Sequence, residues 1–99
     1  MWIRVWEYDV RPSARAAFEQ AYGPEGAWAQ LFSTSEGFRG TELFVSSTRP
    51  DRYLTVDRFV DARAWDEFLA ANGEAYQRLD AETEHLTAGE RELAVGDVV

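Results

Sequence analysis

The sequence contains no cysteine and no lysine, and all ten of its basic residues are arginine. Without cysteine, the chain has no disulfides, no thiolate nucleophile and no cysteine-ligated zinc or iron–sulfur centre. Without lysine, Schiff-base and amine-nucleophile chemistry on a lysine side chain is excluded. Cysteine and lysine chemistry are therefore excluded for this chain.

Positive charge is also scarce. Eighteen acidic residues against ten basic ones give a net charge of -8, and such a field repels nucleic-acid phosphates and anionic lipid heads. Residues 1–8 are strand-like and carry Arg4 and Glu7, unlike the apolar core of a signal peptide or a membrane span. We expect no nucleic-acid partner, no membrane partner and a cytoplasmic location.

The chain has a single histidine, His85, which follows Glu82 by three residues. One Glu-x-x-His pair is weak evidence for a metal, because a stable site needs further ligands from elsewhere in the chain. A solvent-facing histidine on an acidic surface is the commoner arrangement, and a Ser-His-Asp triad has no better support. We expect no metal site.

Aromatic residues, in contrast, are abundant: the 99 residues include four Trp, four Tyr and six Phe, and 45% of the chain is hydrophobic. This composition predicts one folded core and a single domain over residues 1–99. A domain this short leaves much of its surface exposed to solvent, so an additional interface would stabilise it.

The first segment, 2–10, is rich in β-branched and aromatic residues and predicts a strand that ends before Pro12. Its even positions are Trp2, Arg4, Trp6 and Tyr8, and its odd positions begin with Ile3 and Val5. Because both faces are partly apolar, we expect this strand to be covered on both sides.

The remaining segments alternate between helical and strand patterns. We expect a helix capped by Ser13, a second helical piece around residues 28–32, and a hairpin of strands 41–46 and 53–59. Asp61 opens a long amphipathic helix that reaches Leu86 with a kink near Gly73, and residues 90–99 form a last strand.

This order, β-α-β-β-α-β, is the ferredoxin-like or split βαβ plan, an α+β fold with helices on one face of a four-stranded antiparallel sheet. The residues that carry a likeness to a known family are the segment 6–12, Phe18-Glu19, the segment 37–43, the strand 53–59 and the amphipathic run through Phe68. With these the chain resembles the antibiotic-biosynthesis-monooxygenase-like (ABM) domains of the dimeric α+β-barrel superfamily. The resemblance implies a homodimer in which two sheets pack face to face and form a barrel.

The same resemblance implies a function. Family members include oxygenases that act on phenols, quinols or polyketides without a cofactor, and their ligand cleft lies between the helices and the sheet. Haem-degrading members use an asparagine on the first strand and a histidine on the second long helix. Neither is matched, since Trp6 occupies the first position and the segment 75–80 contains no histidine.

A candidate site follows if the even residues of the first strand face the helices. Asp57 would then act as a base, and Arg4 or Tyr8 would stabilise the developing oxyanion. Aromatic and hydroxyl side chains would bind a flat apolar molecule by stacking and hydrogen bonds. These expected substrate-binding residues are Trp6, Tyr53, Thr55, Phe59, Trp65 and Tyr76.

Other interpretations remain open. Trp and Tyr are common core residues, and Arg4 and Asp57 can simply pair across strands. A homodimer that binds a small molecule or acts in stress without catalysis is a second hypothesis. A structural interaction domain with a completely filled interior is a third.

Overall fold

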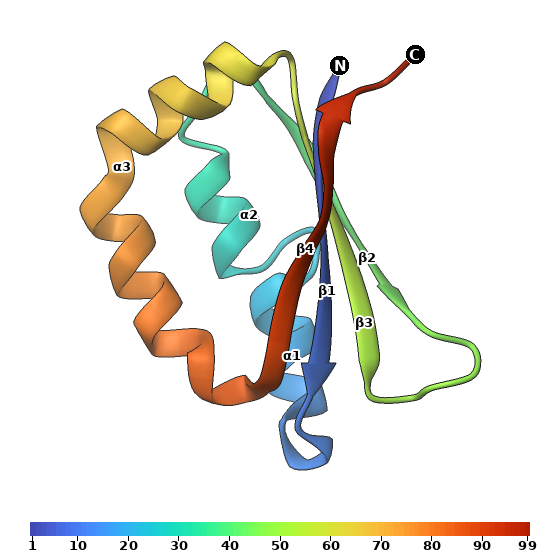
Figure 1. The fold of residues 1–99 in the computed structure, drawn as a ribbon. Coiled ribbons are helices and arrows are strands. Elements are labelled where there is room, and N and C mark those ends of the chain that lie inside the picture. Colours follow the sequence, from blue (N-terminus) through green and yellow to red (C-terminus); the bar gives the residue numbers. More distant parts are fainter.

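The computed structural model describes residues 1–99 and confirms the expected α+β fold (Figure 1). Its strands form one antiparallel sheet in the order β2-β3-β1-β4, the ferredoxin-like arrangement. The strands are β1 (Trp2–Val10), β2 (Phe38–Val45), β3 (Arg52–Phe59) and β4 (Thr87–Asp97). The helices are α1 (Arg15–Tyr22), α2 (Ala27–Phe32) and α3 (Ala62–Thr83), with short 3-10 turns at Pro12–Ala14 and Glu84–Leu86.

Several boundaries differ from the sequence expectation, including the start of β2, which is at Phe38 rather than residue 41. Ser13 does not cap the first helix, because a 3-10 turn begins at Pro12 and encloses it, and α1 starts only at Arg15. The last strand begins at Thr87 rather than residue 90, because α3 ends at Thr83. There the hydroxyl of Thr83 donates to the carbonyl of Leu79 at 2.9 Å, and a 3-10 turn tightens the chain.

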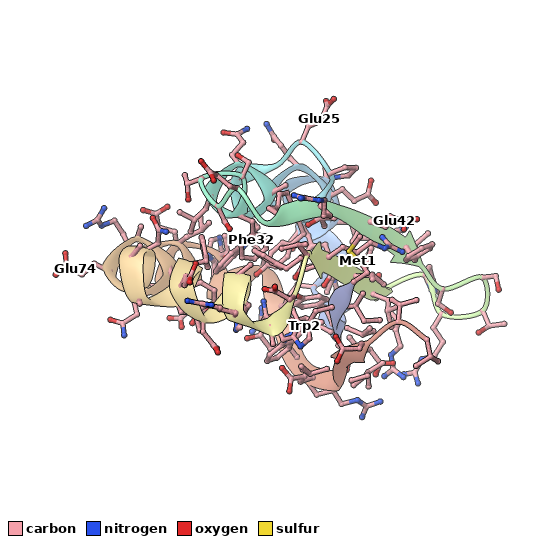
Figure 2. All side chains as sticks on the ribbon, turned by 90° about the horizontal axis from the view of Figure 1, so that it is seen from above. Met1, Trp2, Glu25, Phe32, Glu42 and Glu74 are labelled. Atoms are coloured by element: carbon pink, nitrogen blue, oxygen red, sulfur yellow. The ribbon has the colours of Figure 1, made fainter.

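All three helices lie on one side of the sheet, as Figure 1 shows. β3 alternates strictly between buried and half-buried residues, which is the period of a strand with one face on the core. Seen from above, Phe32 of α2 lies between α3 and the sheet, while Glu74 and Glu25 point away from the body (Figure 2). The core is largely aromatic, and the side chains with least exposure are Phe18, Tyr53 and Phe59.

The long helix α3 is capped and kinked. The carboxylate of Asp61 accepts from the backbone N–H of Ala64 at 2.8 Å, which satisfies one of the free donors of the first turn. Asn72 has non-helical backbone angles (φ -126°, ψ 20°), and its side-chain amide donates to the carbonyl of Phe68 at 3.1 Å. The kink expected near Gly73 is thus present, one residue earlier. None of the helices combines the length and apolarity that a membrane crossing requires.

The other face of the sheet is mostly apolar at its centre and charged at its edges. Ile3, Val5, Leu54 and Val56 lie there half-buried, and Phe44 is 46% exposed. Ion pairs surround them: Arg52 with Glu7 and Asp9, Arg91 with Glu7, and Arg58 with Glu42. Both faces of β1 therefore carry apolar side chains, but only one is covered by this chain's own helices.

Gly26, which precedes α2, has the closest backbone approach of the seven glycines. A Cβ atom at this position would lie 2.3 Å from the carbonyl oxygen of Gln20 and 2.5 Å from that of Ala21. We expect Gly26→Ala to lower the free energy of unfolding by about 3 kcal/mol, because these backbone atoms cannot move without displacing α1. Urea unfolding measures this loss.

Gly73 provides the matched control, since a Cβ atom there meets nothing within 4 Å. Gly73→Ala is expected to raise the free energy of unfolding by about 0.5–1 kcal/mol, because alanine restricts the unfolded chain more than glycine does. Equal unfolding midpoints for the two variants would show that the fold accommodates a Cβ atom at Gly26 without loss of stability.

Candidate functional site

A cavity lies between the helices and the sheet, on the face that carries the even residues of β1. Its volume is about 40 Å³, which is room for about three water molecules. Strands contribute most of the polar side chains, and helices contribute most of the rings. Its lining residues are Arg4, Trp6, Tyr8, Tyr22, Trp28, Phe32, Thr41, Thr55, Asp57, Tyr76, Asp80 and Glu90.

The centre of the cavity is a row of three polar side chains on neighbouring strands. The register places Arg4 of β1 and Thr41 of β2 directly opposite Asp57 of β3. The Thr41 hydroxyl donates to Oδ1 of Asp57 at 2.7 Å, and Nη1 of Arg4 lies 3.6 Å from Oδ2. All three residues are buried. Each carboxylate oxygen thus has one partner and a further lone pair for a ligand.

Burial raises the pKa of the Asp57 carboxyl above its ordinary value. The hydrogen bond from Thr41 and the charge of Arg4 both lower this pKa, but desolvation is the larger effect. A carboxylate with a raised pKa is a stronger base than a solvated one, so Asp57 is suited to remove a weakly acidic proton.

The raised pKa also predicts how stability depends on pH. Between the ordinary carboxyl pKa of about 4 and the raised value, folded Asp57 holds more protons than unfolded Asp57, so stability falls as pH rises through this interval. We expect the free energy of unfolding of the wild type, minus that of Asp57→Asn, to decrease from pH 4.5 upward and then level off. Urea unfolding across this range measures the difference, and an increase with pH would contradict the raised pKa.

Arg4 is held between aromatic rings. Its guanidinium carbon lies 3.9 Å from the centroid of the Trp65 ring and 5.8 Å from that of Trp6. Trp65 also stacks on Trp2, with centroids 5.9 Å apart. These cation–π contacts fix the guanidinium beside Asp57 in a site with little water.

Two phenols complete the wall nearest α1. Tyr8 and Thr55 share a hydrogen bond of 3.2 Å, and Tyr22 donates to the hydroxyl of Thr83 at 3.1 Å. Burial raises the pKa of Tyr22 to about 12 and raises that of Tyr8 further. Both phenols therefore remain protonated near neutral pH, so they act as hydrogen-bond donors rather than as bases.

Two exposed acidic residues mark the mouth of the cavity: Asp80 on the second half of α3, and Glu90 on β4. Burial, followed by repulsion from Asp80 and Glu84, raises the pKa of Glu90. A ring-sized ligand needs more than 40 Å³, so its entry requires movement at this mouth. The kink at Asn72 separates the part of α3 that carries Trp65 from the part that carries Tyr76 and Asp80.

The structure brings most of the expected site residues together. Arg4, Trp6, Tyr8, Thr55, Asp57 and Tyr76 line the cavity, and Trp65 lies behind Arg4.

Tyr53 and Phe59 were expected to contact the ligand but do not line the cavity, because they lie at the two ends of β3. Helix α1 covers Tyr53, whose hydroxyl donates to Glu19 and accepts from Arg15, and Phe59 packs between Phe32 and Trp65.

Sequence reasoning did not assign Thr41, Tyr22, Trp28, Phe32, Asp80 or Glu90 to the site. Thr41 could have been predicted from the sequence. Residues two apart on a strand lie on the same face, and Thr41 is two residues before Leu43. The α1 and α2 residues could not be predicted in this way, since their orientation depends on how two short helices pack. No group of three or more histidine, aspartate or glutamate side chains converges as metal ligands, and His85 is exposed.

The comparison that decides the family is a sequence match to the antibiotic biosynthesis monooxygenase (ABM) model over residues 1–88. The chain belongs to the antibiotic biosynthesis monooxygenase family. The ABM match spans β1 through the start of β4, and so includes every cavity residue except Glu90. Among curated proteins, none matches this sequence.

Solved structures share the fold. A mutant of SnoaB, a cofactor-independent oxygenase from Streptomyces nogalater, superposes with a TM-score of 0.78 at 17% identity, over 98% of this chain and 91% of that one. Rv0793 from Mycobacterium tuberculosis superposes with a TM-score of 0.69 at 20% identity, over 98% of this chain and 96% of that one. Protein SO0527 from Shewanella oneidensis superposes with a TM-score of 0.69 at 23% identity, over 97% of this chain and 92% of that one. At these identities the likeness establishes the ABM fold, and residue roles depend on the geometry above.

Proposed function

We propose that this chain is a cofactor-independent monooxygenase that oxidises an aromatic small molecule of the phenol, quinol or polyketide type. The observation that carries the proposal is the buried carboxylate of Asp57, paired with Arg4 inside a ring-lined cavity. Membership of the ABM family and the fold shared with the oxygenase SnoaB support it.

In the proposed reaction, Asp57 takes the proton of a bound phenol or, for an anthrone, of its phenolic anthrol tautomer, and the raised pKa of Asp57 favours this transfer. The guanidinium of Arg4 stabilises the phenolate that forms, and the hydroxyl of Tyr8 also donates to it when Thr55 is the donor in the hydrogen bond between Tyr8 and Thr55. The electron-rich anion reduces dioxygen, which adds to a ring carbon. When that carbon is a CH2 group, loss of water leaves a carbonyl, so that CH2 and O2 become C=O and H2O.

Trp6, Thr55 and Tyr76 surround the ligand in this proposal and exclude water from the reacting pair. Trp65 acts through Arg4, on which it stacks, and is a positioning residue. Phe59 packs in the core at one end of β3, and Tyr53 bonds to α1 at the other end. Neither contacts the ligand in this proposal.

We propose further that the working form is a homodimer, with the sheet face around Val5 and Leu54 as the interface. This face is apolar at its centre and bears both signs of charge at its edges, so a twofold axis can bring unlike charges together. A second copy would cover the side of β1 that this chain's helices leave open.

Oxygen uptake tests the proposed activity. Dithranol, a dihydroxyanthrone with a reactive CH2 group and a phenolic anthrol tautomer, is compared with its trimethyl ether, 1,8,9-trimethoxyanthracene, which has no phenolic proton in any form. We expect protein-dependent oxygen consumption with dithranol, one O2 for each anthraquinone formed, and none with the ether. Equal rates for the two compounds, or no consumption across a panel of phenols, quinols and tetracyclic aromatics, would remove the proposal.

A non-catalytic binding domain remains the alternative function. It predicts ligand-dependent thermal stabilisation of wild-type protein and of Asp57→Asn alike, without oxygen consumption. Thermal shift and oxygen uptake on the same samples separate the two functions.

A further inference from the structure

Two buried hydrogen-bond donors of the cavity have no acceptor inside the protein. They are the indole Nε1 atoms of Trp6, on β1, and of Trp28, on α2. Both side chains line the cavity, and Trp28 is only 6% exposed. A buried N–H without a partner is costly and uncommon, so two at one cavity require acceptors from the molecules that occupy it.

The hydroxyl groups near these indoles are already engaged. Tyr8 and Thr55 bond to each other, and Tyr22 donates to Thr83. Trp28 lies near enough to the Tyr22 hydroxyl to oppose the rise of that phenol's pKa, but the two groups do not have hydrogen-bond geometry.

Arg4 adds to the excess of donors. Its guanidinium approaches Asp57 at 3.6 Å and otherwise contacts the faces of Trp65 and Trp6. A guanidinium has five N–H donors and no acceptor. The interior of the cavity therefore offers unused donors on Trp6, Trp28 and Arg4, which fit acceptor oxygens on a ligand.

The acidic mouth narrows the choice of ligand. Asp80 and Glu90 lie there, and their charge disfavours the entry of an anion such as a carboxylate or phosphate. Among neutral oxygen acceptors on a flat ring, the carbonyl groups of aromatic ketones and quinones are stronger acceptors than phenol or ether oxygens.

We infer that the cavity selects an aromatic carbonyl compound of the quinone class, whose oxygens accept hydrogen bonds from the indole N–H groups of Trp6 and Trp28. The inference rests on the proposed function for the choice of this cavity as the site, and it names two specificity-determining residues. In the proposed reaction the carbonyl formed from CH2 meets the same donors, so the product is held as well as the substrate.

The four tryptophans give a direct readout, because each contributes one indole signal to a ¹H–¹⁵N spectrum. Signals are assigned with single Trp→Phe variants. The probes are 1,4-naphthoquinone and naphthalene, which share a ring frame and differ in two carbonyl oxygens. The chain has no cysteine or lysine side chain with which the quinone would form adducts.

With naphthoquinone, we expect the Trp6 and Trp28 indole protons to shift downfield while that of Trp2, which is not a cavity residue, stays in place. Naphthalene should produce no downfield shift. Trp28→Phe should weaken naphthoquinone binding about five- to tenfold, the effect of one lost hydrogen bond, and change naphthalene binding less than twofold. Trp2→Phe is the matched control and should change neither.

Failure of naphthoquinone to bind, unmoved Trp6 and Trp28 signals at saturation, or equal losses for both probes in Trp28→Phe would each overturn the inference. Quinone binding through these indoles without oxygen consumption by any phenol removes the proposed activity and leaves the inference standing. Oxygen consumption in a protein whose Trp6 and Trp28 signals do not respond removes the inference alone.

Discussion

Replacement of Asp57 by asparagine is expected to lower kcat for dithranol oxidation by about a hundred- to ten-thousandfold, the usual effect of removing a general base. Asparagine has nearly the same shape and still accepts from Thr41, but it cannot take a proton. Dithranol binding should change much less than kcat, because the rings that surround the ligand remain. Oxygen-electrode rates and binding titrations measure the two effects separately.

Asp66→Asn is the control for this prediction. Asp66 is exposed on α3 and does not line the cavity, so Asp66→Asn removes the same charge without changing the site. Its rate should equal that of the wild type. If Asp57→Asn oxidises dithranol as fast as Asp66→Asn does, then Asp57 is not the base, whatever its pKa.

The second large effect concerns the proposed dimer. Leu54 lies on the apolar face of the sheet, and Leu54→Asp would place two carboxylates, one from each copy, in the interface. An uncompensated buried charge costs about 3–5 kcal/mol, so two copies should weaken the dimer by roughly ten-thousandfold or more. Light scattering at micromolar concentration should give twice the 11.3 kDa chain mass for the wild type and the single chain mass for the variant.

Ser47→Asp introduces the same charge at an exposed position between β2 and β3, away from the sheet face, and should remain dimeric. A wild-type chain that is monomeric at this concentration would end the dimer proposal. A dimer that persists in Leu54→Asp would place its interface on another surface.

The fold and part of the site were accessible from the sequence because strands have a period of two. Once the even residues of β1 face the helices, antiparallel pairing puts Arg4 opposite Asp57, and this pair needs no knowledge of helix packing. The capping role of Asp61 was accessible for a similar reason, since it depends only on local hydrogen bonding.

Tertiary packing determined what the sequence did not reveal. Trp28 lies on a six-residue helix whose orientation depends on its contacts with Tyr22 and Tyr76, and no local pattern encodes those contacts. Phe59 follows the same alternation as Asp57, yet at the strand end it meets the helix core instead of the cavity. Ser13 failed as a cap because the proline before it began a turn of its own.

The central claim is that the cavity binds a neutral phenol and Asp57 removes its proton. Anaerobic absorption spectroscopy of dithranol at neutral pH tests this most directly, because the anthrone anion absorbs at longer wavelength than the neutral form. We predict that wild-type protein produces the anion spectrum with one equivalent of ligand for each chain, and that Asp57→Asn binds dithranol in the neutral form. A neutral spectrum with saturating wild-type protein, or the anion spectrum with both proteins, would contradict the account.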